Sequence, residues 1–281
     1  MDAAKKLSLE KIACKIRMGA IEGVFHAKSG HPGGSLSIAD LLSYLYFSEL
    51  KVDPSNPQWE DRDRLVLSKG HTAPALYAAL ALKGYFDISE MQTLRHVGAL
   101  LQGHPDMKTI PGVDMSSGSL GQGISAAAGM ALGAKLSGKD FRVFTILGDG
   151  EIQEGQVWEA AMFSAAKKLD NLVAIVDNNG LQIDGNIADV NSPYPIDEKF
   201  AAFGWEVVNI DGHNLDEIEC ALEKAKKCTG KPFAIIMKTV KGKGVSFMEN
   251  AVNWHGSAPN AEQYEVAINE LKATLAELEA K

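Results

Sequence analysis

Unbroken apolar runs that end in glycine or polar side chains constrain the fold of this chain most. The clearest runs are 141–147 and 172–176, which lead into Gly148-Asp149-Gly150 and Asn178-Asn179. A strand that is buried on both faces reads as a continuous apolar run, and such strands are typical of parallel sheets covered by helices. We therefore predict an α/β fold in which a parallel central sheet is flanked by helices on both faces.

Strand-like and helix-like segments alternate along the chain. Short apolar runs predict strands at 64–68, 141–147, 171–177, 205–210 and 233–239. Helical spacing and composition predict helices at 7–28, 35–50, 73–82, 89–94, 120–136, 154–168, 214–228 and 261–281. His31-Pro-Gly-Gly34 and 98–118 are predicted loops, and Asn214 with Glu217 is predicted to form a capping box. This alternation indicates parallel βαβ units with right-handed crossovers.

Length and composition limit the classes of function. The 281 residues are 46% hydrophobic, which fits one domain over 1–281. A net charge of -8 argues against nucleic acid as a partner, because nucleic acids are bound through clustered Lys and Arg. The three cysteines have no Cys-x-x-Cys spacing, which fits a reducing cytoplasm. We expect neither a signal peptide nor a membrane span, because no apolar run is long enough.

Two polar motifs follow neighbouring predicted strands. The carboxyl ends of such strands meet at one edge of the sheet, where α/β proteins bind ligands. Gly148 and Gly150 let backbone amides approach phosphate oxygens, and Asp149 and Asn179 offer a carboxylate and an amide oxygen to a divalent cation. Taken singly, each motif is also typical of a turn. Paired at this spacing, they predict a site for a diphosphate and its metal ion.

Four of the seven histidines lie in Gly- or Pro-bearing loops after predicted elements: His31, His71, His104 and His255. Catalytic groups collect in the loops at one edge of such a sheet, so these four residues are candidates for binding or catalysis. His26, His96 and His213 lack such a setting, and we expect them to be structural.

Seven ordered segments resemble the transketolase family, specifically its amino-terminal, diphosphate-binding domain. They are 29–37 (SGHPGGSLS), 67–71 (LSKGH), 103–106 (GHPD), 118–123 (GSLGQG), 148–155 (GDGEIQEG), 177–185 (DNNGLQIDG) and 254–256 (WHG). The resemblance covers nearly the whole chain.

The resemblance implies thiamine diphosphate as the cofactor and assigns residues to it and to a Mg²⁺ or Ca²⁺ ion. The metal ligands would be Asp149, the Asn179 side chain and the Leu181 carbonyl. The residues lining the cofactor would be Gly118, Ser119, Leu120, Gly150, Asn179 and Ile183, the last against the thiazolium ring. The histidines on the diphosphate would be His71 and His255, and those facing the sugar would be His31, His104 and His255.

By the same resemblance, the activity is transfer of a two-carbon ketol unit from a ketose phosphate to an aldose phosphate. The pyrimidine-binding and carboxy-terminal domains of the family lie outside this chain, so we expect them on a partner subunit of roughly 300 residues, with two copies of each chain. The partner would supply a catalytic glutamate and most contacts to the sugar phosphate. Glu154 would lie in the hydrogen-bond network near that glutamate, or would alternatively be a favourable acid in the first turn of a helix.

Other readings remain open at this level. The metal motifs alone also fit half of a 2-oxo acid dehydrogenase or of a deoxyxylulose-phosphate-synthase-like enzyme, whereas the histidine motifs favour sugar chemistry. A non-catalytic cofactor-binding subunit would be expected to have damaged motifs, and these are intact. The chain is expected to be a natural subunit, with truncation of a longer chain as the alternative.

Overall fold

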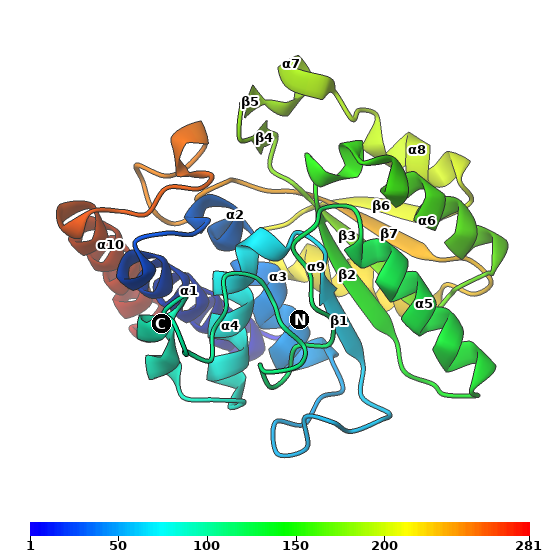
Figure 1. Ribbon diagram of the computed structural model, residues 1–281, viewed down its shortest axis with the longest axis horizontal. Helices are drawn as coiled ribbons and strands as arrows, with labels where there is room; N and C mark the ends of the chain where they lie inside the picture. Colours follow the sequence, from blue (N-terminus) through cyan, green and yellow to red (C-terminus); the bar gives the residue numbers. More distant parts are fainter.

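The computed structural model describes all 281 residues and contains a five-stranded parallel sheet of order β1-β2-β3-β7-β6 (Figure 1). The strands are β1 (Arg64–Leu67), β2 (Val143–Gly148), β3 (Leu172–Asn178), β7 (Phe233–Lys238) and β6 (Glu206–Asp211). All four pairings between them are parallel. The five predicted strands and the parallel arrangement are confirmed.

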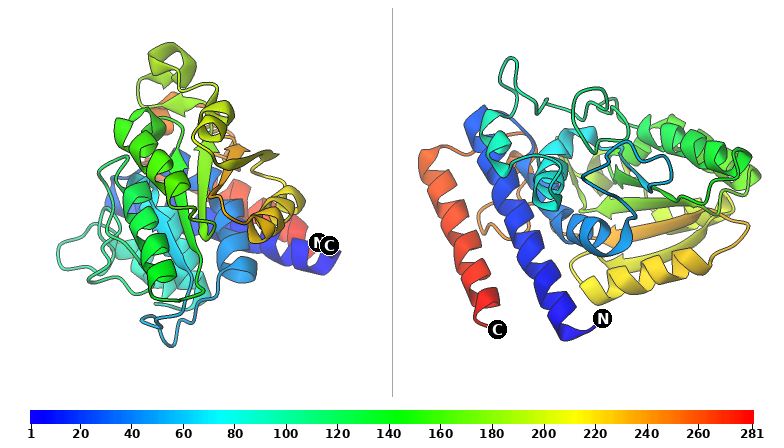
Figure 2. Two further views of the ribbon diagram at one scale, coloured as in Figure 1. Left: turned by 90° about the vertical axis from the view of Figure 1, so that its right-hand side faces the viewer. Right: turned by 90° about the horizontal axis from the view of Figure 1, so that it is seen from below.

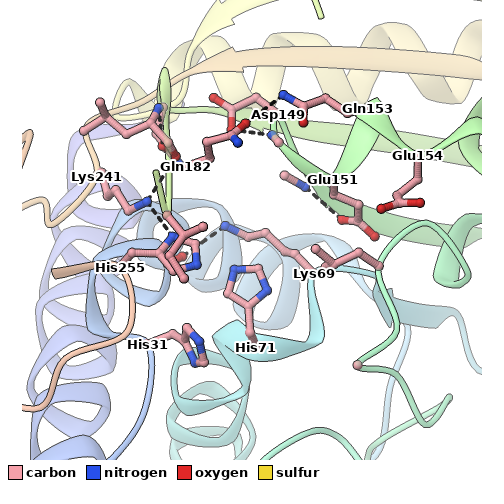
Figure 3. A pocket seen from close by; sticks show the side chains of 18 of the residues that line it. His31, Lys69, His71, Asp149, Glu151, Gln153, Glu154, Gln182, Lys241 and His255 are labelled. Carbon is pink, nitrogen blue, oxygen red and sulfur yellow. Dashed lines mark hydrogen bonds between the residues drawn. The ribbon is translucent and has the colours of Figure 1, made fainter. Parts of the chain in front are cut away.

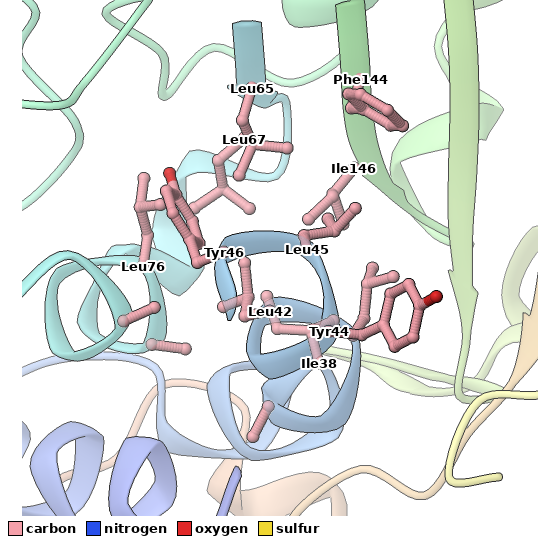
Figure 4. Packing of buried hydrophobic residues seen from close by; sticks show 14 of the residues in the cluster. Ile38, Leu42, Tyr44, Leu45, Tyr46, Leu65, Leu67, Leu76, Phe144 and Ile146 are labelled. Carbon is pink, nitrogen blue, oxygen red and sulfur yellow. The ribbon is translucent and has the colours of Figure 1, made fainter. Parts of the chain in front are cut away.

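Helices cover both faces of this sheet, which confirms the predicted fold class. On one face, Leu65 and Leu67 of β1 and Phe144 and Ile146 of β2 pack against buried residues of the amino-terminal helices (Figure 4). The alternate strand residues, such as Val66, join a second core with helices on the other face. Because successive side chains of a strand point to opposite faces, two cores explain why the strands read as continuous apolar runs.

The helices on the first face are α1 (Ala3–Ala27), α3 (Ala39–Tyr44), α4 (Ala73–Lys83) and α9 (Leu215–Lys227), whereas α2 (Pro32–Ser37) contributes Leu36 to a third core. Those on the second face are α5 (Gly123–Leu136), α6 (Gly155–Ala166) and α8 (Ile196–Ala202). A 3₁₀ segment occupies Ile88–Thr93, and the chain then runs without regular structure until α5. None of the helices combines the length and apolar character that crossing a bilayer requires.

The segment that follows His31 differs from the prediction of a loop and one helix from residue 35. A helix begins at Pro32, and His31 is its N-cap residue. Proline is favoured at the first position of a helix because its missing N–H would have no partner there. The helix is interrupted at Ile38, resumes as α3, and ends in a π-helical turn over Leu45–Glu49.

The complete capping box lies at a different helix from the predicted one. The Asn214 side chain accepts from the backbone N–H of Glu217 at 3.4 Å, but a Glu217 oxygen accepts from the backbone N–H of Asp211 instead of Asn214. In contrast, both arms are present between Asn260 and Gln263, at the start of α10 (Ala261–Glu279). The predicted box is therefore half formed.

Helix α10 lies beside α1 at the edge of the molecule (Figure 2). Leu271 of α10 is buried against Cys14 of α1, whose thiol donates to the Leu271 carbonyl at 3.2 Å. The same core includes Val245 and Met248 from the loop between β7 and α10. This packing matters for the site because that loop carries His255.

Residues 181–191 form a small outlying unit that the sequence did not predict. It contains a two-stranded antiparallel hairpin of β4 (Leu181–Gln182) and β5 (Gly185–Asn186), followed by α7 (Ile187–Asn191). Gly185 has φ 144°, a conformation that glycine adopts more readily than other residues. The unit projects beyond the carboxyl edge of the sheet (Figure 1).

Candidate functional site

A polar cavity of about 350 Å³ lies at the carboxyl edge of the central sheet. The structure brings most of the predicted site residues together around it: His31, His71, His104, Gly118, Leu120, Asp149, Gly150, Glu154, Asn179, Leu181, Ile183 and His255. Ser119 does not line this cavity but a small neighbouring hollow with Ser117 and Gln122. The structure shows that these residues lie close together, and the role of each residue stays a prediction.

Of the three predicted metal ligands, Asp149 and Asn179 directly follow β2 and β3, and Leu181 begins β4. One Asp149 oxygen accepts from the Gly150 N–H at 2.8 Å, and the other accepts from the Gly180 N–H at 2.6 Å. The Asn179 side-chain oxygen accepts from the Leu181 N–H at 3.1 Å. Both side chains are therefore held in place by backbone amides of the strand ends. No cluster of three or more His, Cys, Asp or Glu side chains is arranged to hold a metal, so a cation here would need the amide, the carbonyl and the phosphate oxygens as well.

Asp149 has the electrostatic setting of a cation ligand. Its side chain is buried, and burial together with the nearby Asp177 carboxylate raises its pKa to about 7. Removing a carboxylate from water is costly unless a positive charge compensates. Carboxylate, amide and carbonyl oxygens are the ligands that Mg²⁺ and Ca²⁺ prefer, so this donor set fits a divalent ion bound together with a diphosphate.

Asp177 forms a buried ion pair beneath the cavity. Lys69 donates to it and also to the Gly34 carbonyl at 3.0 Å, and the hydroxyls of Ser37 and Thr239 donate to the same carboxylate. Burial alone would raise the pKa of Asp177, but the Lys69 ammonium and these hydrogen bonds hold it below its ordinary value. The network joins the ends of β1, β3 and β7 to α2.

Lys241 is a second buried cation of the cavity. Its amine donates to the Leu181 carbonyl at 3.0 Å and lies 2.8 Å from Nδ1 of His255. Burial lowers its pKa to about 8. The Lys241 amine thus contacts the carbonyl that is expected to bind the metal ion. A buried positive charge at this wall of the cavity favours an anionic ligand there.

His213, which we expected to be structural, supports the backbone next to Lys241. Its Nε2 accepts from the Val240 N–H at 2.9 Å, so the proton lies on Nδ1, which is 2.7 Å from Asp40. Asp40 is also paired with Arg17 of α1. His213 thus fixes the start of the loop that carries Lys241 without facing the cavity.

Three histidines form a compact group on one side of the cavity. The ring centroids of His31 and His71 are 5.0 Å apart, and His255 lies 5.5 Å from His31 and 5.4 Å from His71. His31 and His71 lie across the cavity from Asp149 (Figure 3). His104 is exposed at the mouth, where its ring packs so closely on Gly118 that a Cβ there would approach it to 3.1 Å.

The histidines are held in the neutral form. Burial, followed by the charge of Arg95, lowers the pKa of His31 to about 4. Burial and Lys241 lower the pKa of His255 to about 3, and burial with Lys69 places that of His71 well below its ordinary value. A neutral imidazole can donate from one nitrogen and accept at the other. The group can therefore donate hydrogen bonds to hydroxyls and accept hydrogen bonds from them at neutral pH.

Glu151 organises the loops around the cofactor motifs. Its carboxylate accepts from the N–H of Gly121 at 2.9 Å and of Gly148 at 3.0 Å, and from the Ser68 hydroxyl. Burial raises its pKa in spite of these hydrogen bonds. The Gly148 amide donates to Glu151 and the Gly150 amide donates to Asp149, and the predicted approach of both amides to phosphate oxygens stays a prediction.

Glu154 lines the cavity and is exposed. It is the N-cap residue of α6, and its side chain makes no capping hydrogen bond. The alternative of a favourable acid within the first helical turn is therefore wrong, because the residue precedes that turn. Its predicted place near a partner glutamate stays a prediction.

Several lining residues escaped the sequence reasoning: Lys69, Glu151, Gln153, Gln182 and Lys241. Gln153 donates to the Gln182 side chain and to the Asn191 carbonyl, both at 2.7 Å, and so ties α7 to the cavity. Lys69 and Lys241 each follow a predicted strand within a glycine-bearing loop, the same signal that identified the histidines. A lysine in such a loop is usually solvated, so burial was the missing information.

Comparisons with known proteins show the family of this chain. The family model for the transketolase thiamine diphosphate binding domain matches residues 8–275. The chain is 49% identical over 268 residues to the 6-deoxy-6-sulfo-D-fructose transketolase subunit SqwG of Clostridium sp. (strain MSTE9), which covers 95% of this chain and 98% of that protein. It is 41% identical over 272 residues to one of the subunits of apulose-4-phosphate transketolase from Phocaeicola vulgatus, covering 97% of this chain and 96% of that protein.

Longer transketolases match over part of their length. Human transketolase is 40% identical over 272 residues, covering 96% of this chain but 43% of the human protein. The crystal structure of transketolase from Campylobacter jejuni superposes with a TM-score of 0.89 at 34% identity, covering 99% of this chain and 46% of that chain. This chain thus spans less than half of those proteins and nearly all of the two bacterial subunits. It belongs to the transketolase family and corresponds to the thiamine diphosphate binding domain of that family.

Proposed function

We propose that this chain, with a partner subunit, transfers a two-carbon ketol unit from a ketose to an aldose, using thiamine diphosphate and Mg²⁺ or Ca²⁺. The observation that carries the proposal is the group of neutral histidines across the cavity from Asp149. The names of the two bacterial relatives, each given as one subunit of a transketolase, support a two-chain enzyme. We also propose an α2β2 assembly, a partner of roughly 300 residues and a cytoplasmic location.

The residues of this chain divide between two tasks. Asp149, Asn179 and the Leu181 carbonyl would hold the metal ion, and Lys241 would face the diphosphate. When bound, thiamine diphosphate supplies the nucleophilic carbon and the electron sink that the reaction needs. The protein then has to position the ketose and move protons on its hydroxyl groups.

The histidines fit that second task. His31, His104 and His255 present neutral imidazoles, which can accept a proton from a sugar hydroxyl and return it when the bond between the fragments is remade. Three neighbouring imidazoles also recognise a row of hydroxyls by geometry. An enzyme for 2-oxo acids has no such row to bind, which favours sugar substrates over that alternative.

The names of the relatives define the substrates to test. One relative is named for 6-deoxy-6-sulfo-D-fructose and the other for apulose 4-phosphate, and both compounds carry an anionic group. We therefore propose ketoses and aldoses with a terminal anionic group as the substrate class. The partner would supply most contacts to that group.

The test combines binding with group transfer. Calorimetry would titrate thiamine diphosphate and Mg²⁺ into the purified chain, alone and with the protein encoded by the adjacent reading frame. Transfer would then be followed from fructose 6-phosphate, 6-deoxy-6-sulfofructose and apulose 4-phosphate to an aldose phosphate. We expect ketol transfer only in the mixture. Tight cofactor binding without transfer from any ketose would contradict the proposed activity and favour another thiamine diphosphate enzyme or a non-catalytic subunit.

A further inference from the structure

Arg95 lies between the loops that carry two of the sugar-facing histidines. It follows the 3₁₀ segment Ile88–Thr93 and has φ 64°, in the left-handed region. Its backbone N–H donates to the Leu101 carbonyl at 2.9 Å, which closes a tight loop. Non-glycine residues adopt this conformation rarely, and they keep it where the surroundings demand it.

The guanidinium group of Arg95 bridges the two histidine loops. Nη1 donates to the Ser29 hydroxyl at 2.7 Å, and Nη2 donates to the Gly103 carbonyl at 3.3 Å. Ser29 precedes His31 by two residues, and Gly103 directly precedes His104. A Cβ at position 103 would lie 3.2 Å from Nε of Arg95, so glycine allows the close approach. The planar fork of arginine suits two acceptors in different directions, which a lysine cannot reproduce.

The charge of Arg95 is also directed at these histidines. No carboxylate lies within ion-pair distance of it. Burial is the main cause that lowers the pKa values of His31 and His104, and the positive charge of Arg95 is the second cause for both. The other ionisable groups around His31 are His71, His104, His255 and Lys241. Nε of Arg95 and Nδ1 of His31 are buried and have no hydrogen-bond partner, so they remain available to a bound hydroxyl or water.

We propose that Arg95 is a positioning residue that holds the His31 and His104 loops at a fixed separation, so that both imidazoles reach the same sugar. This inference rests on the proposed function only for the identity of the ligand. The clamp itself is a property of this chain.

The first experiment tests whether Arg95 holds the two loops, and it does not depend on enzymatic activity. Imidazole ¹⁵N signals would be titrated in the purified chain for wild type, Arg95→Lys and Arg95→Met. We expect Arg95→Met to move the His104 midpoint upward by roughly half a pH unit or more, because a nearby cation is lost. Arg95→Lys should largely retain the midpoint but broaden the His31 and His104 signals, since the fork is lost. Unchanged signals in both variants would overturn the clamp.

The second experiment reads transfer in the assembled enzyme. We expect Arg95→Lys and Arg95→Met to lower kcat/KM for the ketose roughly 10- to 100-fold, because a small displacement of a positioning group can reduce the rate by that factor. The affinity for thiamine diphosphate should stay within about twofold of wild type. Ser29→Ala removes only the hydrogen bond from Arg95 to the His31 loop and should lower kcat/KM roughly two- to tenfold. Gln92→Ala, on the neighbouring 3₁₀ segment, removes a bond to Glu22 and is the control that should leave kcat/KM unchanged.

The two experiments separate the failure of each idea. If the assembled wild type transfers nothing, the proposed function fails, and the imidazole titration still decides the clamp. If wild type is active and Arg95→Lys keeps kcat/KM within about twofold, the clamp is wrong. Should Arg95→Met not fold, Arg95→Lys and Ser29→Ala still decide the question.

Discussion

Asp149 and Asp177 show how two buried carboxyl groups at the ends of neighbouring strands acquire different chemistry. Asp177 has a lysine and two hydroxyls around it, and its pKa is lowered. Asp149 accepts hydrogen bonds from two backbone amides, and its pKa is raised to about 7. Environments that push the pKa values of such a pair apart assign separate tasks to them. Here one carboxylate is a structural ion-pair partner, and the other is available to a cation.

Replacing Asp149 by Ala should abolish metal-dependent cofactor binding. The substitution removes the one carboxylate of the proposed metal site, and we expect thiamine diphosphate affinity in the presence of Mg²⁺ to fall by at least roughly 100-fold. The measurement is the rise in Tm of the chain on adding both ligands, which should vanish. Asp189→Ala, on the exposed helix α7, is the matched control. Wild-type affinity in Asp149→Ala would show that the cradle is assigned wrongly.

Replacing Lys69 by Met should destabilise the chain strongly. Asp177 would keep its burial but lose its counter-charge, and breaking a buried pair in this way costs about 3–5 kcal/mol. Urea unfolding followed by tryptophan fluorescence measures the free energy of unfolding. Lys135→Met removes a partly exposed pair with Asp170 and should cost less than about 1 kcal/mol. Equal losses in the two variants would argue against an uncompensated charge on Asp177.

The residues that the sequence revealed and those that it hid differ in a physical way. Asp149, Asn179 and the four loop histidines stand next to glycine or proline at strand or helix ends, where backbone geometry itself marks a site. Lys69 became recognisable only through its partner Asp177, which is 108 residues away along the chain. Such long-range pairing depends on the order of the strands, which periodicity does not give.

At the scale of elements, the sheet was predicted better than the helices near the cavity. The strands lie within about two residues of their predicted bounds, because burial on both faces gives an unmistakable apolar run. The helix expected from residue 35 is split at Ile38, and the glycines before it are helical. Gly33 and Gly34 read as loop formers, yet tertiary contacts with Lys241 and Thr72 leave no room for larger residues.

Helix α10 is expected to stabilise the loop that carries His255. Leu271 is 1% exposed, and its side chain lies against Gly244 as well as α1. Leu271→Ala should cost about 2–5 kcal/mol through the cavity that it leaves. Hydrogen–deuterium exchange should increase at 242–256 more than at 100–118. Val266→Ala, at an exposed position of the same helix, is the control. An equal change in exchange at 242–256 and at 100–118 in Leu271→Ala would show that α10 does not support the site.

At the scale of the whole molecule, large apolar side chains are exposed both at the cavity mouth and on α6. Leu120 and Ile183 line the mouth and are 37% and 64% exposed, and Met162 and Phe163 of α6 are 57% and 38% exposed. Helix α6 begins directly after Glu154, the residue predicted to face the partner. Exposed large apolar side chains that a neighbouring subunit covers are typical of interaction sites. We therefore expect the partner subunit to cover these side chains.

The variant Met162→Glu should weaken assembly without affecting cofactor binding. A charge buried at an interface without a counter-charge is costly, so we expect the dissociation constant for the partner to rise by roughly 10-fold or more. Light scattering of the mixed subunits provides the measurement. Val97→Glu, at a fully exposed position of another loop, is the control. Normal assembly of Met162→Glu would place the interface elsewhere.

The division of the cavity between sheet and loops has an evolutionary consequence. Asp149 and Asn179 directly follow two adjacent strands of the central sheet, so a substitution there disturbs the sheet itself. His31, His104 and His255 sit on three separate loops, of which the first two are joined by Arg95, and loops tolerate changes of length and residue better than strands do. A lineage can therefore inherit the cofactor apparatus unchanged while its sugar preference diverges one loop at a time. Divergence of this kind would account for one relative being named for a sulfosugar and another for apulose 4-phosphate.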